Sequence, residues 1–126
     1  MKSILLLAFI FMLGTVAVNG QTVQKAKASY YHSKFNGRKT ASGDTYWDHF
    51  LTAASNIYKL GTKLLITNPI TGKSVQVLVN DRMAPHIKGR VDLSKAAYKE
   101  IASLSTGITP VHIEVVDGDK KKNENL

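Results

Sequence analysis

The chain has 126 residues, no cysteine and a formal net charge of +8. This length allows one small domain once any leader is removed, and the lack of cysteine excludes a disulfide-stapled scaffold. We therefore expect a bacterial cell-envelope protein with a basic surface that suits anionic partners, although no basic–aromatic cluster of the kind that binds nucleic acid is present.

Residues 1–20 predict a secretory signal peptide. Lys2 precedes an unbroken apolar run over residues 4–13, and residues 18–20 are small or polar before a cut at Gln21. The apolar run is too short for a transmembrane helix, which needs about 20 residues. No lipobox cysteine follows the run, so we expect an exported protein, periplasmic or secreted, with neither a transmembrane span nor a lipid anchor.

The remaining sequence predicts a short polar lead over 21–27, a mostly β domain over 28–116 and a charged, disordered tail over 117–126. Apolar–polar alternation and turn residues predict four of its strands and a polar loop long enough to suggest a function. One short helix is expected at about residues 94–104, with Ser94 as its N-cap and Gly107 as its end. The predicted strands are 28–31, 63–67, 75–79 and 111–115, and short strands of this kind suggest a small barrel.

Carboxylate chemistry remains after other kinds of site are ruled out. The chain has no Cys/His metal pattern, no phosphate-binding glycine loop and no nucleophile elbow, so we expect no metal and no cofactor. Most of the carboxylates suit structural roles or exposed positions. Glu100 and Glu114 fall on exposed faces, Asp92 suits the positive end of the helix dipole, Asp44 suits a turn, and Asp48 gives no clear signal.

Asp81 differs because the alternating valines of residues 75–79 bring it to the buried face at the end of a strand. A carboxyl group partly removed from water keeps its proton to higher pH, which suits a general acid for glycosidic bond cleavage. The position also suits a structural carboxylate that accepts hydrogen bonds from loop amides or pairs with Arg90. Arg82, on the opposite face, is expected to pair with a neighbouring carboxylate or with the loop.

Four longer segments together resemble the rare lipoprotein A (RlpA) family over residues 28–115. In chain order they are ASYYHSKFNGRKTASGDTY, LTAAS, LGTKLLITNPITGKSVQVLVNDR and GRVDLSKAAYKEI. The resemblance implies a six-stranded double-psi β-barrel and an endolytic transglycosylase that acts on peptidoglycan glycan strands stripped of their stem peptides. We expect the protein to be a monomer. Export and the lack of a basic–aromatic cluster argue against a nucleic-acid partner. The peptidoglycan-binding SPOR domain of many family members is not found in this sequence.

The resemblance also implies which residues act. Asp81, in V-N-D-R, would protonate the oxygen that leaves C1 of N-acetylmuramic acid, and the 6-hydroxyl of the same sugar would then attack C1. A 1,6-anhydro end results without a water molecule, so one carboxylate can serve where ordinary glycosidases use two. Asp44 stands where the family usually has Glu, and Ser55 stands where it usually has His; both are expected to support Asp81 in the groove.

Other residues of the expected groove follow from their chemistry, and other functions stay open. Tyr46 is expected to stack on a sugar ring or to lie in the core, Arg38 to meet lactyl carboxylates, and Arg82 to border the groove. An expansin-like module that binds cell-wall glycan without cutting it is favoured by Ser55. A hydrolase of cellulose-like glycans would need Asp44 and Asp81 about 6.5–9.5 Å apart.

Overall fold

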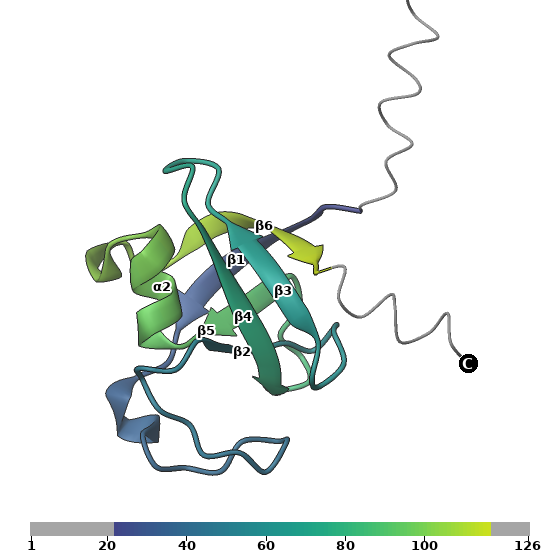
Figure 1. The fold of residues 1–126 in the computed structure, drawn as a ribbon, viewed down its shortest axis with the longest axis vertical. Coiled ribbons are helices and arrows are strands. Elements are labelled where there is room, and N and C mark those ends of the chain that lie inside the picture. The colour runs from purple at the N-terminus through teal and green to yellow at the C-terminus, as the bar shows by residue number, and fades with distance from the viewer. Residues whose placement is uncertain (1–21, 117–126) are drawn as a thin grey trace, which may run out of the picture.

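The computed structural model describes residues 22–116, so the predicted signal peptide and tail lie outside the described residues. Six strands close into a barrel in the order β1-β5-β2-β4-β3-β6 (Figure 1), which confirms the predicted double-psi β-barrel with one short helix. The strands are β1 (Gln24–Tyr30), β2 (Thr52–Ala54), β3 (Lys63–Thr67), β4 (Ser74–Asp81), β5 (Arg90–Leu93) and β6 (Thr109–Val115). Between residues 22 and 116, no helix has the length and apolar character needed to cross a membrane.

Two parallel strand pairs, β1 with β5 and β2 with β4, distinguish this barrel from a simple meander. The short strand β2 lies between β4 and β5, and its last residue, Ala54, has Asp81 as partner on one side and Asp92 on the other. Two strand spacings separate these aspartates, so their Cα atoms lie about 10 Å apart across Ala54. The topology thus brings two carboxylates to the same end of the barrel.

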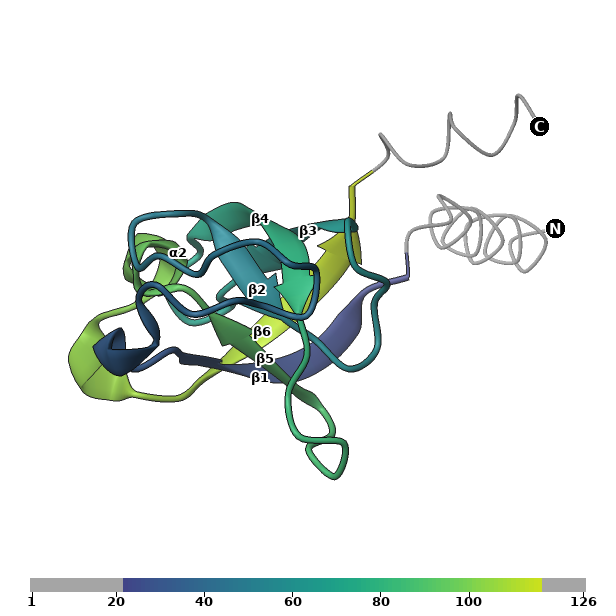
Figure 2. The ribbon, with the colours of Figure 1, turned by 90° about the horizontal axis from the view of Figure 1, so that it is seen from below.

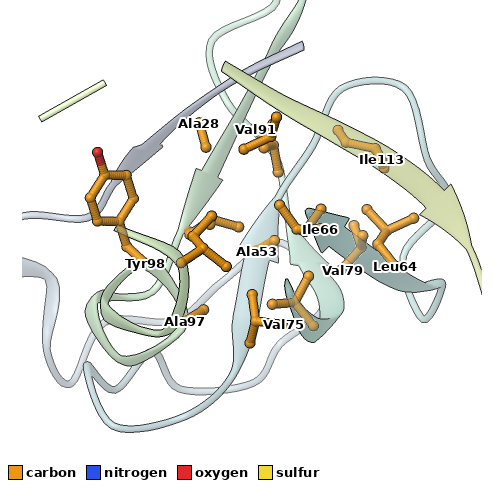
Figure 3. Packing of buried hydrophobic residues seen from close by; sticks show 14 residues of the cluster. Ala28, Ala53, Leu64, Ile66, Val75, Val79, Val91, Ala97, Tyr98 and Ile113 are labelled. Carbon is orange, nitrogen blue, oxygen red and sulfur yellow. The ribbon is translucent and has the colours of Figure 1, made fainter. Parts of the chain in front are cut away.

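Inward-pointing aliphatic side chains from all six strands fill the barrel, and α2 (Lys95–Ile101) covers one side of it (Figures 1 and 3). Ser94 caps this helix, as predicted, by accepting a hydrogen bond from the Ala97 amide. Ala97, Tyr98 and Ile101 are buried on its inner face. The strands' contribution to the core includes Leu64, Ile66, Val75, Val77, Val79, Val91 and Ile113.

Two predicted boundaries are wrong. The lead predicted over 21–27 contains the start of β1, because residues from Gln24 onward pair with β6 while the lysines among them face solvent. The helix ends at Ile101 and not near Leu104, since Asn68 and Thr71 donate side-chain hydrogen bonds to the Ile101 carbonyl oxygen. Another helical turn would have needed that oxygen as an acceptor; Leu104–Thr106 instead forms a separate 3₁₀ turn.

Candidate active site

A hollow of about 390 Å³ opens at one end of the barrel, and Tyr31, Tyr46, Ala54, Asp81 and Asp92 are among the residues that line it. Figure 2 looks at this end, where the long segment between β1 and β2 lies across the barrel and the loop between β4 and β5 projects beside it. Small Ala54 lies between the two aspartates in the strand order. The hollow therefore combines a small floor residue with two carboxylates and aromatic walls.

Asp81 reaches this hollow through a bulge in β4. Ala53 is paired with Val79 and Ala54 with Asp81, so Asn80 is an extra residue without a partner on β2. A bulge redirects the side chains that follow it, which explains why Asn80 is 4% exposed although strict alternation predicts it on the outer face. The alternation nevertheless predicts a carboxylate at the end of this strand, and the structure places Asp81 in the hollow.

Three hydrogen bonds hold the carboxylate of Asp81. Its Oδ1 atom accepts from the backbone amides of Ala41 and Arg82, each at 2.9 Å. Its Oδ2 atom accepts from the Tyr31 hydroxyl at 2.6 Å. The two oxygens therefore differ, because Oδ1 already has two donors while Oδ2 has one hydroxyl that can rotate. The loop amides predicted for a structural carboxylate are present, but the proposed partner Arg90 instead donates to the Ser29 hydroxyl.

Tyr31, which the sequence offers only as one of several tyrosines able to stack on a sugar ring, is a functional candidate because of its contact with Asp81. Its ring stacks on Tyr46 with centroids 4.2 Å apart, and Phe35 meets it edge-on at 5.8 Å. Burial, followed by the hydrogen bond to Asp81, raises the pKa of Tyr31, so its hydroxyl stays protonated as a donor. Only the alternation of β1 past its last residue could have indicated that this tyrosine turns toward the barrel end.

Tyr46 supports Tyr31 more than it offers a free face to a ligand. It is 2% exposed, and its hydroxyl donates to Asp48 at 2.7 Å. Burial and this hydrogen bond raise the pKa of Tyr46. Burial alone would disfavour ionised Asp48, but hydrogen bonds from Tyr46, Ser33 and Asn36 together with the charge of Lys95 outweigh it and lower the pKa of Asp48. This network fixes the segment that forms one wall of the hollow.

Asp92, which the sequence assigns to the helix dipole, is the second carboxylate of the hollow. Ser29 donates a hydrogen bond to it at 3.1 Å. Burial raises the pKa of Asp92; the Ser29 hydrogen bond and the Arg90 charge oppose this effect, and the nearby charge of Asp81 adds to it. Its burial next to β2 could not be seen from sequence because β5 is a four-residue strand with no long alternation.

Asp92→Asn is expected to stabilise the fold at neutral pH by a few degrees in melting temperature. Because its pKa is raised in the folded state, Asp92 contributes stability below the unfolded pKa of about 3.9, and that contribution is lost as pH rises through the folded pKa. The amide avoids this loss and can still accept from Ser29. Thermal melts across pH should show a gain at pH 7 that vanishes in acid; a pH-independent difference would contradict the assignment.

Ser55 and Arg82 act mainly on the loop that follows β2. The Ser55 hydroxyl, in a residue 3% exposed, accepts from the amides of Ile57 and Tyr58 at 3.1 and 3.2 Å. Arg82 borders the hollow, but its guanidinium donates to the carbonyl oxygens of Ser55 and Tyr58, both at 2.6 Å. Arg82 therefore pairs with a loop, which is one of the two partners predicted for it, and Ser55 is a turn residue outside the lining of the hollow.

Ser55→Ala is accordingly expected to cost about 1 kcal/mol of stability, the usual size of a lost side-chain hydrogen bond, and to leave glycan binding unchanged. The two amides of Ile57 and Tyr58 lose their shared acceptor. Chemical denaturation and glycan co-sedimentation of the same preparation measure the two quantities. A loss of glycan binding at unchanged stability would instead indicate that Ser55 contacts the glycan in the groove.

The other predicted groove residues separate into two groups. Arg38 lines the Asp81 hollow, and its guanidinium lies over the Phe35 ring at 5.2 Å. Asp44 is exposed and lines a different hollow on the other side of the Lys39–Thr45 bridge. The second carboxylate that lines the Asp81 hollow is thus Asp92, whereas Asp44 lines the other hollow.

The fold and the site together define a small double-psi β-barrel with two aspartates in a hollow at one end. A family model described as lytic transglycolase matches residues 23–113. The chain belongs to this family, the RlpA-like double-psi β-barrels, as the sequence motifs predict.

Curated relatives agree with this membership. The chain is 44% identical over 95 residues to the endolytic peptidoglycan transglycosylase RlpA of Pasteurella multocida, covering 75% of this chain and 32% of that protein. It is 40% identical over 121 residues to the protein of the same name from Haemophilus influenzae, covering 86% and 42% respectively. The chain therefore spans less than half the length of these relatives.

Solved structures show the same fold at lower identity. An expansin of Clavibacter michiganensis, determined in complex with cellohexaose, superposes with a TM-score of 0.59 at 22% identity, over 75% of this chain and 50% of that one. The papain inhibitor of Streptomyces superposes with a TM-score of 0.62 at 21% identity, over 75% and 94%. At such identities these neighbours establish the barrel architecture alone.

Proposed function

We propose that this barrel is an endolytic peptidoglycan transglycosylase of the cell envelope, with Asp81 as its general acid and base. The observation that carries the proposal is the position of Asp81, held at the hollow by two amides on Oδ1 and one hydroxyl on Oδ2. Family membership and relatives named as RlpA transglycosylases support the same chemistry.

The unequal oxygens of Asp81 suit proton transfer. Oδ1 accepts from the Ala41 and Arg82 amides and stays an acceptor, so the transferable proton belongs on Oδ2. From there it would pass to the glycosidic oxygen that leaves C1 of N-acetylmuramic acid. The 6-hydroxyl of that sugar attacks C1 and returns its proton to the same carboxylate, which closes the 1,6-anhydro ring and regenerates the acid. Because the nucleophile is intramolecular, one carboxylate is sufficient.

The walls of the hollow supply binding contacts in this proposal. Arg38 and Lys39 line it and bring positive charge toward the lactyl carboxylates of muramic acid. Phe35, half-buried beside Arg38, offers an apolar face to a sugar ring. The substrate is therefore an anionic glycan strand whose stem peptides have been removed.

The test is a digest of peptide-stripped glycan strands with protein lacking residues 1–20. We expect mass spectrometry to detect products that carry 1,6-anhydro-muramyl ends. Because the cut is endolytic, these products should have many different lengths. Reducing ends without an anhydro ring would indicate hydrolysis and contradict the proposal.

A binding module without catalysis is the second candidate, because Ser55 is committed to a turn and offers no assisting base to Asp81. In that case the same strands should co-sediment with the protein and remain uncut. Binding without new ends of any kind would favour this second function.

A further inference from the structure

A cluster of exposed apolar side chains lies on the other side of the 37–46 segment from Asp81. Trp47, Phe50 and Leu51 are 39%, 47% and 45% exposed, and they line a second hollow of about 390 Å³ together with Asp44 and Asn80. We name these five residues the Trp47 surface. Single exposed apolar residues are common on protein surfaces, but contiguous exposed apolar patches are not, and such patches usually mark a binding site.

Polar groups accompany the aromatic rings of this surface. The Asp44 side chain is exposed at its edge. The Oδ1 atom of Asn80 is buried and has no hydrogen-bond partner among residues 22–116, although a buried amide oxygen is normally paired. The His49 ring stacks on Trp47 with centroids 6.2 Å apart and meets the Phe50 ring edge-on at 4.5 Å. The surface therefore combines an aromatic cluster with an exposed carboxylate at its edge and a buried, unpaired amide oxygen next to it.

The Trp47 surface is continuous with the candidate active site through Gly37. A Cβ atom built on Gly37 would lie 3.9 Å from the Cη2 atom of the indole, so the ring reaches over this residue. Gly37 has a φ of +87°, which favours glycine, and it precedes Arg38. Arg38 and Phe35 line the Asp81 hollow, so a path runs from Asp81 past these two residues to the indole.

We propose that the Trp47 surface is an outer subsite for the glycan strand whose cleavage was proposed above, and this inference rests on that function. A pyranose ring has an apolar C–H face and a rim of hydroxyls, which matches exposed aromatic side chains flanked by the exposed Asp44 carboxylate. A strand that lies in the Asp81 hollow and extends past Arg38 would place a later sugar over the indole. The subsite would thus make binding depend on strand length.

The chain provides its own reporter, because Trp47 is its single tryptophan. Titration with glycan uses the Asp81→Asn protein, which should bind strands without cutting them. Long peptide-stripped strands are expected to shift the tryptophan emission. The N-acetylmuramic acid–N-acetylglucosamine disaccharide would occupy the Asp81 hollow alone and is expected to leave the emission unchanged.

Trp47→Ala in the same background is expected to weaken binding of long strands about tenfold, the effect of one lost aromatic stacking contact. Binding of the disaccharide should not change, and Trp47→Phe should recover part of the loss. Ile70→Ala is the matched control, since Ile70 is 75% exposed in the turn between β3 and β4 and removes apolar surface elsewhere. Co-sedimentation measures binding of long strands by all four proteins, and titration calorimetry measures binding of the disaccharide.

Three results would overturn the inference. Long strands that co-sediment without altering the emission would show that the glycan bypasses Trp47 while the proposed function stands. Self-association that requires Trp47 and is insensitive to strands, seen by analytical ultracentrifugation, would assign the surface to a second copy of the chain. Absence of both cleavage by the native protein and binding by the Asp81→Asn protein would remove the proposed function together with the subsite.

Discussion

Asp81→Asn is expected to reduce formation of 1,6-anhydro ends about a thousandfold, within the range that general acid catalysis supplies, while fold and glycan binding persist. The amide oxygen can still accept from the Ala41 and Arg82 amides, and the amide nitrogen can donate to the Tyr31 oxygen. What the amide lacks is a proton that it can transfer to a leaving oxygen. The rate of anhydro-end formation and co-sedimentation with intact strands measure the two expectations.

Glu100→Gln is the matched control, because it removes the same charge from an exposed position on α2. It should cleave at the native rate. An Asp81→Asn protein that unfolds, by circular dichroism, would mark Asp81 as a structural carboxylate for the loop amides. An Asp81→Asn protein that folds and still cleaves would remove Asp81 from the chemistry altogether.

The fold was predictable to the extent that its elements carry local signals. The strands from Lys63–Thr67 and Ser74–Asp81 alternate clearly around a turn, and they pair as expected. The strands Thr52–Ala54 and Arg90–Leu93 carry no such pattern because each is short and is held by neighbours distant in sequence. Only the family motifs predicted six strands, since motif order encodes long-range pairing that periodicity cannot detect.

The candidate site shows the same division. Asp81 was predictable because it ends an alternating strand, although the bulge at Asn80 that sets its orientation was not. Asp44 and Ser55 were assigned to the groove by motif position, but the first lines another hollow and the second caps a turn. Asp92 entered the hollow through the pairing of β5 with β2, a tertiary contact without any signal in the residues around it.

Tyr31→Phe is expected to lower kcat for glycan cleavage by about one to two orders of magnitude and to leave KM unchanged. Tyr31 is a positioning residue here, because it acts on Oδ2 of Asp81 through a single 2.6 Å hydrogen bond. A hydrogen bond to a charged group is worth about 1.5–3 kcal/mol. If this energy is lost from the transition state, the rate falls by the stated one to two orders of magnitude. The phenylalanine ring keeps the stacking on Tyr46, so the wall of the hollow persists.

Tyr30→Phe tests whether the loss belongs to this hydroxyl in particular. Its neighbour Tyr30 packs on Tyr98 with ring centroids 4.8 Å apart and donates to the Leu104 carbonyl oxygen. Neither Tyr30 nor Leu104 lines the Asp81 hollow. Removing that hydroxyl should cost about 1 kcal/mol of stability with no change in kcat. If both variants lose stability and neither loses kcat, Tyr31 is a packing residue. A fall in kcat confined to Tyr31→Phe, at unchanged KM, makes Asp81 orientation its function.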